Sequence, residues 1–316
     1  MPTPITIAQL RAYRGPNIHG PLPGALLRIT SAADRARRLR AAVRDGAQAI
    51  GLVIAYLEAE SRPLGDGFLL EARFSTDEPE IGAELCRYIV AGMRAEAAGD
   101  EEWDRDGPLY ALQARRRREA LPVPALQLLA EARRRGLPAM RLPDGRLQIG
   151  YGARGWAYDP RSDTAPAPPW GRLGAIPVTL ITGDALRAAA VALAAAAIAA
   201  AGVAARAEDG LGFDAARSLL ADPAVEAAVI GLDTDSLLLH GLPVDRCDQA
   251  EICDMGGPRP GSAADDEEWL RALGLPMLLA PGPVRLNLAD QRLSALIPYA
   301  PNGVIGEGSG EGEALP

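Results

Sequence analysis

The sequence predicts a two-domain α/β protein, in which an N-terminal α+β domain precedes a doubly wound, mostly parallel sheet. The chain has 316 residues, and domains usually hold roughly 100–150. Beyond residue 175, strand and helix patterns alternate regularly, as they do in parallel sheets. The first half lacks this rhythm, and a Pro-rich stretch at 161–174 has the composition of a linker. The predicted domains are therefore 1–160 and 175–305.

Apolar periodicity predicts the elements of the first domain. Alternation with period two predicts strands at 5–10, 26–29 and 68–74. A first helix, capped by Thr30 or Ser31, is expected to run through Ala47 and on to Leu57. Further helices are expected at 79–97, 108–120 and 124–135. Asp144-Gly145 is typical of a hairpin turn and predicts strands at 139–142 and 146–149.

The second domain opens with a strand of the fully buried type at 176–181. An alanine-rich helix is expected at 185–201, because alanine is the best helix former, and Gly202 closes it. Further strands are predicted at 225–230 and 250–253, a helix around 270–273, and the start of another strand at 277–280. The tail at 306–316 is acidic and glycine-rich, which predicts disorder.

All basic side chains of this protein are arginines, since the sequence contains no lysine. A P-loop nucleotide site uses a lysine to reach the terminal phosphates, and Schiff-base chemistry needs an amine. Both are excluded. The 33 basic and 41 acidic residues give a net charge of −8. This balance argues against a nucleic-acid partner, because binding to phosphate backbones requires clustered positive charge.

The sequence also argues against zinc, secretion and membrane insertion. Three scattered cysteines, Cys86, Cys247 and Cys253, and two histidines are too few for a four-ligand zinc site. The longest apolar run, 188–201, is mostly alanine and is shorter than the ~20 residues that span a bilayer. No secretory leader pattern opens the chain. We therefore expect a soluble cytoplasmic protein without a metal, a cofactor or a membrane partner.

Two groups of polar residues are candidates for binding a substrate or a partner. The run Arg115, Arg116, Arg117 and Arg118 lies on a predicted helix. It is either a solvated helix face or a docking site for an anionic chain. Arg14 and Asn17 flank Gly15-Pro16. They either contact a carboxylate or belong to a turn.

Two stretches of the first domain resemble known enzymes. Arg14-Gly15-Pro16-Asn17 resembles the signature that opens cyanophycin synthetases. The stretch from Arg133 to Gly152 is similar to the place where those enzymes begin their ATP-grasp domain. The resemblance implies a cyanophycin-synthetase-like N-terminal domain with an ATP-grasp remnant at about 122–159. The body of the ATP-grasp domain has no counterpart in this chain.

The second domain resembles the central ATPase domain of Mur ligases. The segment 176–183 is similar to the first strand of that domain, and the similarity resumes at 219–229, 241–248 and 286–287. The resemblance implies a Mur-ligase-central-domain-like sheet at 175–305. The third domain of Mur ligases has no counterpart here.

The residues that bind ATP in this family are replaced. In the family, a Thr-Asn-Gly-Lys-Thr-Thr turn cradles phosphate with its backbone N–H groups, its lysine and its hydroxyl. The corresponding positions, which form a degenerate P-loop, are Thr182, Gly183, Asp184, Leu186, Arg187 and Ala188. Gly231 stands where the family has a metal-binding glutamate, and 253–258 lacks the family's histidine. Asp233 and Asp235 are either loop caps or a replacement metal pair.

These departures predict a catalytically inactive protein, a pseudoenzyme without catalytic residues. We expect a scaffold, regulatory or substrate-holding subunit of an amino-acid ligase whose product resembles polyglutamate or an aspartate–arginine polymer. Its partner would be an active ligase paralogue or a second copy of the chain, and it would hold an anionic polyamino-acid chain. Two alternatives stay open: a ligase subunit that shares an active site in trans with a heteromeric partner, and a stand-alone module that binds a small ligand or peptide.

Overall fold

The computed structural model describes residues 5–162, 167–307 and 314–315, and the chain divides into two compact units. The first unit contains residues 1–15 and 19–120, and the second contains 16–18 and 121–316. The division after Ala120 differs from the boundary expected at 161–174. Residues 121–160 belong to the second unit because they pack there: the N–H of Tyr151 donates to the carbonyl of Gly174, and that of Ala153 to the carbonyl of Val225.

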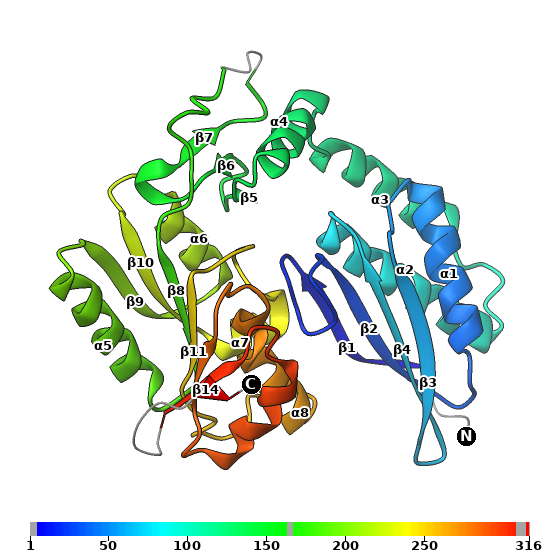
Figure 1. Ribbon diagram of the computed structural model, residues 1–316. Helices are drawn as coiled ribbons and strands as arrows, with labels where there is room; N and C mark the ends of the chain where they lie inside the picture. Colours follow the sequence, from blue (N-terminus) through cyan, green and yellow to red (C-terminus); the bar gives the residue numbers. More distant parts are fainter. Residues whose placement is uncertain (1–4, 163–166, 308–313, 316) are drawn as a thin grey trace. The chain divides into compact units, whose positions relative to one another are not determined.

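The first unit is an antiparallel sheet covered on one face by helices (Figure 1). Its strands lie in the order β1-β2-β4-β3: β1 (Thr6–Tyr13), β2 (Gly24–Ser31), β4 (Gly67–Ser75) and β3 (Leu57–Leu64). The helix α1 (Ala36–Ile50) packs on β3 and β4, and α2 (Pro79–Ala98) packs on β1 and β2. A third helix, α3 (Asp106–Glu119), packs against both of these helices.

The helices and the sheet of the first unit share one apolar core. Leu27, Ile29 and Leu70 of the sheet pack in the same cluster as Leu39 of α1 and Leu85 of α2. Every one of these side chains is fully buried. Three strands and three helices were predicted near their observed positions. The expected continuation of the first helix to Leu57 is wrong: α1 ends at Ile50 because Gly51 adopts a left-handed conformation (φ 73°), and residues 57–64 form the charged strand β3.

A small subdomain opens the second unit. The helix α4 (Val123–Arg134) packs on a three-stranded antiparallel sheet of β5 (Ala139–Arg141), β6 (Leu147–Ile149) and β7 (Trp156–Tyr158). A 3-10 turn, η1 (Gly152–Arg154), precedes β7. The predicted hairpin across Asp144-Gly145 is confirmed, since Gly145 has φ 87° and Met140 faces Gln148 in the register.

A seven-stranded sheet in the order β14-β13-β12-β11-β8-β10-β9 dominates the second unit. Its strands are β8 (Val178–Thr182), β9 (Ala205–Leu211), β10 (Ala227–Leu232), β11 (Gln249–Ile252), β12 (Val284–Asn287), β13 (Val304–Glu307) and β14 (Ala314–Leu315). The six strands β8 to β13 are parallel, and β14 is antiparallel to β13. The predicted mostly parallel sheet is therefore confirmed.

The connecting helices are α5 (Arg187–Ala200), α6 (Phe213–Ala221), α7 (Thr234–His240) and α8 (Asp266–Leu273), with 3-10 helices η2 (Leu275–Leu278) and η3 (Gln291–Tyr299). The chain moves from β8 toward β9 on one side and later returns to place β11 on the other side of β8. The strand order therefore reverses between β8 and β11. In open α/β sheets, ligands bind at such a switch point, beside the carboxyl ends of the strands.

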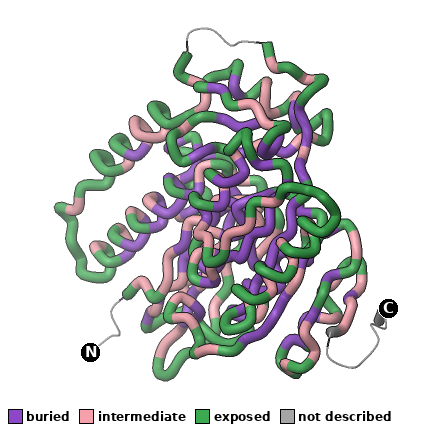
Figure 2. Tube along the Cα trace, turned by 90° about the vertical axis from the view of Figure 1, so that its left-hand side faces the viewer, coloured by how far each residue is buried: buried purple, intermediate pink, exposed green. Residues whose placement is uncertain are grey.

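Burial follows this sheet closely. Every residue of β10 is buried, and Figure 2 shows buried residues gathered along the strands and exposed residues along the outer faces of the helices. One prediction for the second unit is wrong: residues 275–278 form a 3-10 helix where a strand was expected to start at 277. Of the tail expected to be disordered from 306, Gly306 lies in β13 and 314–315 form β14, whereas 308–313 and 316 lie outside the described residues.

No helix in the described part of the chain is long and apolar enough to cross a membrane.

Candidate functional site

The turn that joins β8 to α5 holds a buried carboxylate from another strand. The backbone N–H groups of Asp184, Ala185 and Leu186 donate to the side chain of Asp254, at 2.8, 3.1 and 3.3 Å. The N–H of Gly256 donates to the same carboxylate at 3.1 Å. Asp254 is 5% exposed, so these four donors replace its water shell almost completely. This is the arrangement that phosphate occupies at the start of a helix in nucleotide-binding proteins.

Sheet pairing brings Asp254 to this position. β11 runs parallel to β8, with Glu251 opposite Ile181 and Ile252 opposite Thr182, so that both strands end at the same edge. The N–H of Cys253 continues the ladder by donating to the carbonyl of Thr182 at 2.9 Å. The next residue, Asp254, therefore lies directly beside the turn, at the switch point of the sheet. A ligand would occupy this place in an open α/β fold.

Glycines around the turn make room for carboxylates. Gly183 has φ 142°, and a Cβ there would lie 2.8 Å from the Oδ1 of Asp254. A Cβ at Gly256 would collide with the other carboxylate oxygen of Asp254, and one at Gly257 would collide with the carboxylate of Asp184. The glycines at this site therefore permit the close approach of two aspartates.

A second aspartate holds the loop that carries Asp254. The Oδ2 of Asp290 accepts the N–H of Met255 at 2.9 Å, and Arg292 donates to both carboxylate oxygens at 2.9 and 2.8 Å. The Arg292 guanidinium, helped by the backbone N–H groups of Met255 and Arg292, lowers the pKa of Asp290 to about 2. Asp290 is therefore ionised whenever the protein is folded near neutral pH, and it fixes Met255 next to Asp254.

Arg187, a residue of the predicted degenerate P-loop, belongs to an internal ion pair. Its Nε donates to the Oδ1 of Asp209 on β9 at 2.6 Å, and its Nη1 donates to the carbonyl of Gly183 at 3.0 Å. The side chain of Arg187 is 15% exposed. A Cβ at Gly231 would collide with the same oxygen of Asp209. Gly231 therefore leaves room for this ion pair.

Thr182 and Ala188 offer no free oxygen at the turn. The Thr182 hydroxyl is fully buried and donates to the carbonyl of Leu273 at 2.7 Å. Ala188 is exposed and has no side-chain oxygen. The structure thus brings the predicted residues of the degenerate P-loop together around Asp254, in a turn whose described side chains expose no basic group for a phosphate.

Asp233 and Asp235 act as caps and turn partners. Asp233 is the N-cap of α7 and accepts the N–H of Ser236 at 2.7 Å, while the hydroxyl of Ser236 accepts the N–H of Phe213 at 2.8 Å. Asp235 accepts a hydrogen bond from the hydroxyl of Ser262. Across the described residues, no group of three or more His, Cys, Asp or Glu side chains is arranged to hold a metal ion. Asp233 is therefore a helix cap, and Asp235 is bound by the hydroxyl of Ser262.

The candidates Arg14 and Asn17 belong to different units. Arg14 is half-buried and belongs to the first unit, whereas Asn17 is 3% exposed and belongs to the second. The neighbouring Pro16 accepts the N–H of Leu242 at 2.7 Å. The segment around Pro16 therefore has a structural role within the second unit.

The arginine run on α3 is not one uniform basic surface. Arg115 pairs with Glu119 at 2.8 Å, and Arg116 pairs with Glu78 at 2.7 Å. Arg117 and Arg118 are exposed. Two of the four guanidinium groups are thus neutralised by glutamates of the same unit.

Sequence reasoning missed Asp254 as the centre of the site. The signal available was an acidic residue directly after a buried strand, followed by Gly256-Gly257. Since carboxyl ends of neighbouring parallel strands meet at one edge, that spacing places a carboxylate beside the turn at Gly183. The missing step was the strand order.

Comparison with known proteins gives a family but no activity. No curated protein matches the sequence. Residues 4–307, nearly the whole chain, match a family described as a domain of unknown function, DUF4938. The protein therefore belongs to the DUF4938 family.

Proposed function

We propose that this protein is a catalytically inactive relative of cyanophycin synthetases and Mur ligases, which serves as a scaffold, regulatory or substrate-holding subunit of an amino-acid ligase. The observation that carries the proposal is the carboxylate of Asp254 in the phosphate cradle. It uses the N–H groups of Asp184, Ala185 and Leu186 and adds a negative charge where a triphosphate would bring more. The parallel sheet with a strand reversal beside β8 supports a Mur-like ancestry for the second unit.

The surrounding side chains support the loss of catalysis. Arg187 is held by Asp209 and by the carbonyl of Gly183, and the hydroxyl of Thr182 is bound to Leu273. A P-loop needs a mobile ammonium and a hydroxyl for Mg²⁺ at these positions. The rival function, in which Arg187 completes a partner's active site, receives less support because its guanidinium already has two partners in its own chain.

Titration calorimetry with Mg-ATP tests the inactive site. We expect no heat of binding at micromolar to millimolar nucleotide, and saturable micromolar binding would contradict the proposal.

Affinity purification from the native host tests the partner. An active ligase should be recovered with the chain, and recovery as an isolated monomer would contradict a subunit role.

An activity assay of such a ligase separates the proposal from its rival. We expect this chain, when it is added to the ligase, to change the stability of the ligase or its processivity along the polymer. Arg187→Ala should leave that change intact. A collapse of the catalytic rate caused by Arg187→Ala alone would favour the shared active site.

A further inference from the structure

The strand β3 forms an open edge of the first unit's sheet. It pairs with β4 on one side, and no other described strand lies on its second side. The carbonyl of Tyr56 accepts the N–H of Ser75 at 3.1 Å, so residue 56 points its backbone toward β4. Because this direction alternates along a strand, Leu57, Ala59 and Ser61 direct their N–H and C=O groups toward the open edge. Pro63 has no N–H and ends the run of donors.

The helix α1 lies alongside this edge and turns a row of arginines toward it. Its inner row, Leu39, Val43, Ala47 and Ile50, is buried on the sheet. One flank faces α2, where Arg38 pairs with Glu96 and a Cβ at Gly46 would lie 2.8 Å from Leu85. The opposite flank carries Arg37, Arg40 and Arg44, which follow one another at helical spacings of three and four residues.

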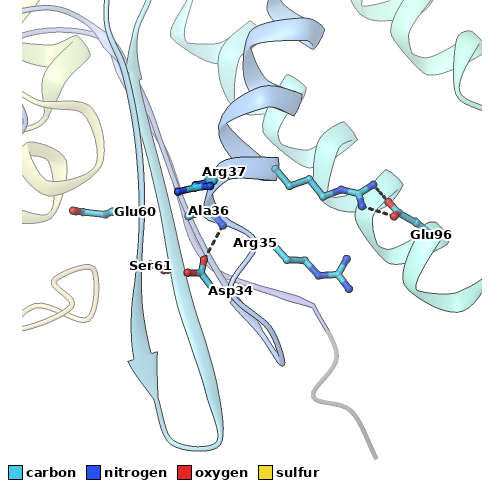
Figure 3. A pocket seen from close by; sticks show the side chains of 8 residues that line it. Asp34, Arg35, Ala36, Arg37, Glu60, Ser61 and Glu96 are labelled. Carbon is cyan, nitrogen blue, oxygen red and sulfur yellow. Dashed lines mark hydrogen bonds and ion pairs between the residues drawn. The ribbon is translucent and has the colours of Figure 1, made fainter.

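Two open cavities locate that flank beside the edge. One, of about 710 Å³, is lined by Arg37 together with Glu60 and Ser61 of β3 (Figure 3). The other, of about 530 Å³, is lined by Arg40, Arg44 and the segment 52–57. The amino end of α1 therefore lies near Ser61 and its later turns lie near Leu57, so that helix and strand run in opposite directions. We call the space between the arginine row and residues 56–61 the edge groove.

The helix side of the edge groove carries net positive charge. In the described part of the chain, Arg37, Arg40 and Arg44 form no ion pair. Asp34 accepts the N–H of Ala36 at 3.0 Å and offsets part of the charge of Arg37. Glu96 binds Arg38, and Glu60 points to the face of the sheet away from α1 (Figure 3).

The opposite face of the sheet is close to neutral at this edge. Glu58, Glu60 and Arg62 alternate with Leu57, Ala59 and Ser61 along β3 and are exposed, and Glu58 pairs with Arg73 of β4. An added strand would therefore meet arginines with the side chains on one of its faces and a surface of balanced charge with those on the other. Two residues of a strand advance by about 6.8 Å, and four residues of a helix, such as Arg40 to Arg44, advance by about 6 Å. Alternate residues of the added strand can thus each meet one arginine.

From these features we propose that the edge groove binds an extended segment of a partner protein as a fifth strand, with acidic side chains at alternate positions and neutral ones between them. Backbone groups of Leu57, Ala59 and Ser61 supply the strand pairing, and Arg37, Arg40 and Arg44 select the acidic face. The inference rests on the proposed function only in requiring a partner, and it uses no residue of the turn at Gly183.

A second copy of the chain fits this groove poorly. A two-fold pairing of β3 with β3 would keep both α1 helices on the same face of the joined sheet. The arginine rows of the two copies would then face each other, and like charges that are brought together repel. Charge complementarity therefore favours an acidic segment.

Fluorescence anisotropy with labelled peptides and the full chain tests the proposal. The probe is Thr-Glu-Thr-Glu-Thr-Glu-Thr, in which threonine favours the strand, and its control is the same peptide with lysine in place of glutamate. We expect saturable binding of the glutamate peptide that weakens with added salt and at least about tenfold weaker binding of the lysine peptide. N-methylation of every second residue of the peptide removes either the N–H groups that face β3 or those that face away from it. We expect one of these two methylated peptides to lose binding and the other to keep it. Equal binding of both peptides, or no effect of either methylation, would overturn the proposal.

Substitutions locate the site. Arg40→Glu with Arg44→Glu should weaken binding of the glutamate peptide at least about tenfold, because it reverses the charge of the groove. The matched control is Arg117→Glu, an exposed arginine of α3 in the same unit, which should leave binding within about twofold. Circular dichroism melts establish that both variants fold.

Unchanged binding in a folded double variant would overturn the proposal, as would sedimentation showing a dimer that Ala59→Pro disrupts. Absence of Mg-ATP binding together with absence of peptide binding would leave the proposed function standing and reject this inference alone.

Discussion

The backbone N–H of Asp184 lies 2.8 Å from the side-chain Oδ1 of Asp254, at the point where a nucleotide-binding sheet would hold phosphate. The two residues are 70 positions apart in the chain. Parallel pairing of β8 with β11 brings them together. The turn therefore keeps its donor geometry but has a carboxylate of its own chain as the acceptor.

Replacing Asp254 should destabilise the second unit. Asp254→Asn keeps the shape but removes the charge and turns an amide donor toward N–H donors. Hydrogen bonds to a charged group contribute roughly 1.5–3 kcal/mol each, and they are not additive, so we expect a loss of about 2–4 kcal/mol. Urea unfolding followed by circular dichroism measures it. The control Glu226→Gln changes an exposed carboxylate of the same unit and should stay within about 0.5 kcal/mol. Equal stability of both variants would contradict the role assigned to Asp254.

We expect the ion pair between Arg187 and Asp209 to require glycine at position 231. A Cβ at this position would meet Asp209 and would lie 2.9 Å from Val191 in the core under α5. Gly231→Ala should therefore cost about 1–3 kcal/mol of unfolding free energy, as overpacking in a core does. The same substitution at Gly261, where a Cβ meets nothing within 4 Å, is the control. If Gly231→Ala is as stable as Gly261→Ala, the close packing described here is wrong.

Acid should weaken the loop that carries Asp254 through Asp290. The pKa of Asp290 is about 2 in the folded protein, below its ordinary value of 3.8, mainly because of Arg292. A depressed pKa contributes stability that is fully present above pH 3.8 and is lost as the pH falls toward 2. Unfolding free energy measured across this window should fall more steeply for the wild type than for Asp290→Asn. Parallel curves would contradict the assignment.

The cysteine thiols should be unreactive in the native protein. Burial raises the pKa of Cys86 and of Cys247 to about 12, and Cys253 is buried as well. Because the thiolate is the reactive form, a thiol reagent at mildly alkaline pH should modify none of the three until the chain unfolds. Mass spectrometry before and after addition of guanidinium chloride counts the labelled sites. Rapid labelling of Cys86 in the native state would show that the core of the first unit opens.

The sequence allowed most strongly periodic elements to be predicted. The core strands β4, β8 and β10 and the helices α2 and α5 lie within two or three residues of their expected positions. The strand β3 was not predicted, because its sequence, Leu-Glu-Ala-Glu-Ser-Arg-Pro-Leu, is charged and carries a proline, as edge strands often do. The strand β9 was also missed, because it is the outer strand of its sheet and three of its side chains are charged.

The site was predictable only in part. Local sequence identified the turn from Thr182 to Ala188, because all of its residues are consecutive. Asp254 and Asp209 reach the turn through strand order, and Asp290 holds the loop that carries Asp254. Periodicity in a single sequence encodes neither arrangement. The edge groove has the same origin: Arg37, Arg40 and Arg44 are visible as a helical row, but their position beside β3 depends on which strand is the outer one.

The carboxylate of Asp254 also has a consequence for any soluble anion in the cell. Because it is covalently tethered beside the turn, it competes as an intramolecular ligand, whose effective concentration can exceed that of a free metabolite by orders of magnitude. We therefore expect that ordinary changes in nucleotide or phosphate levels do not displace Asp254 from this turn, whose donors stay occupied by a carboxylate of the same chain.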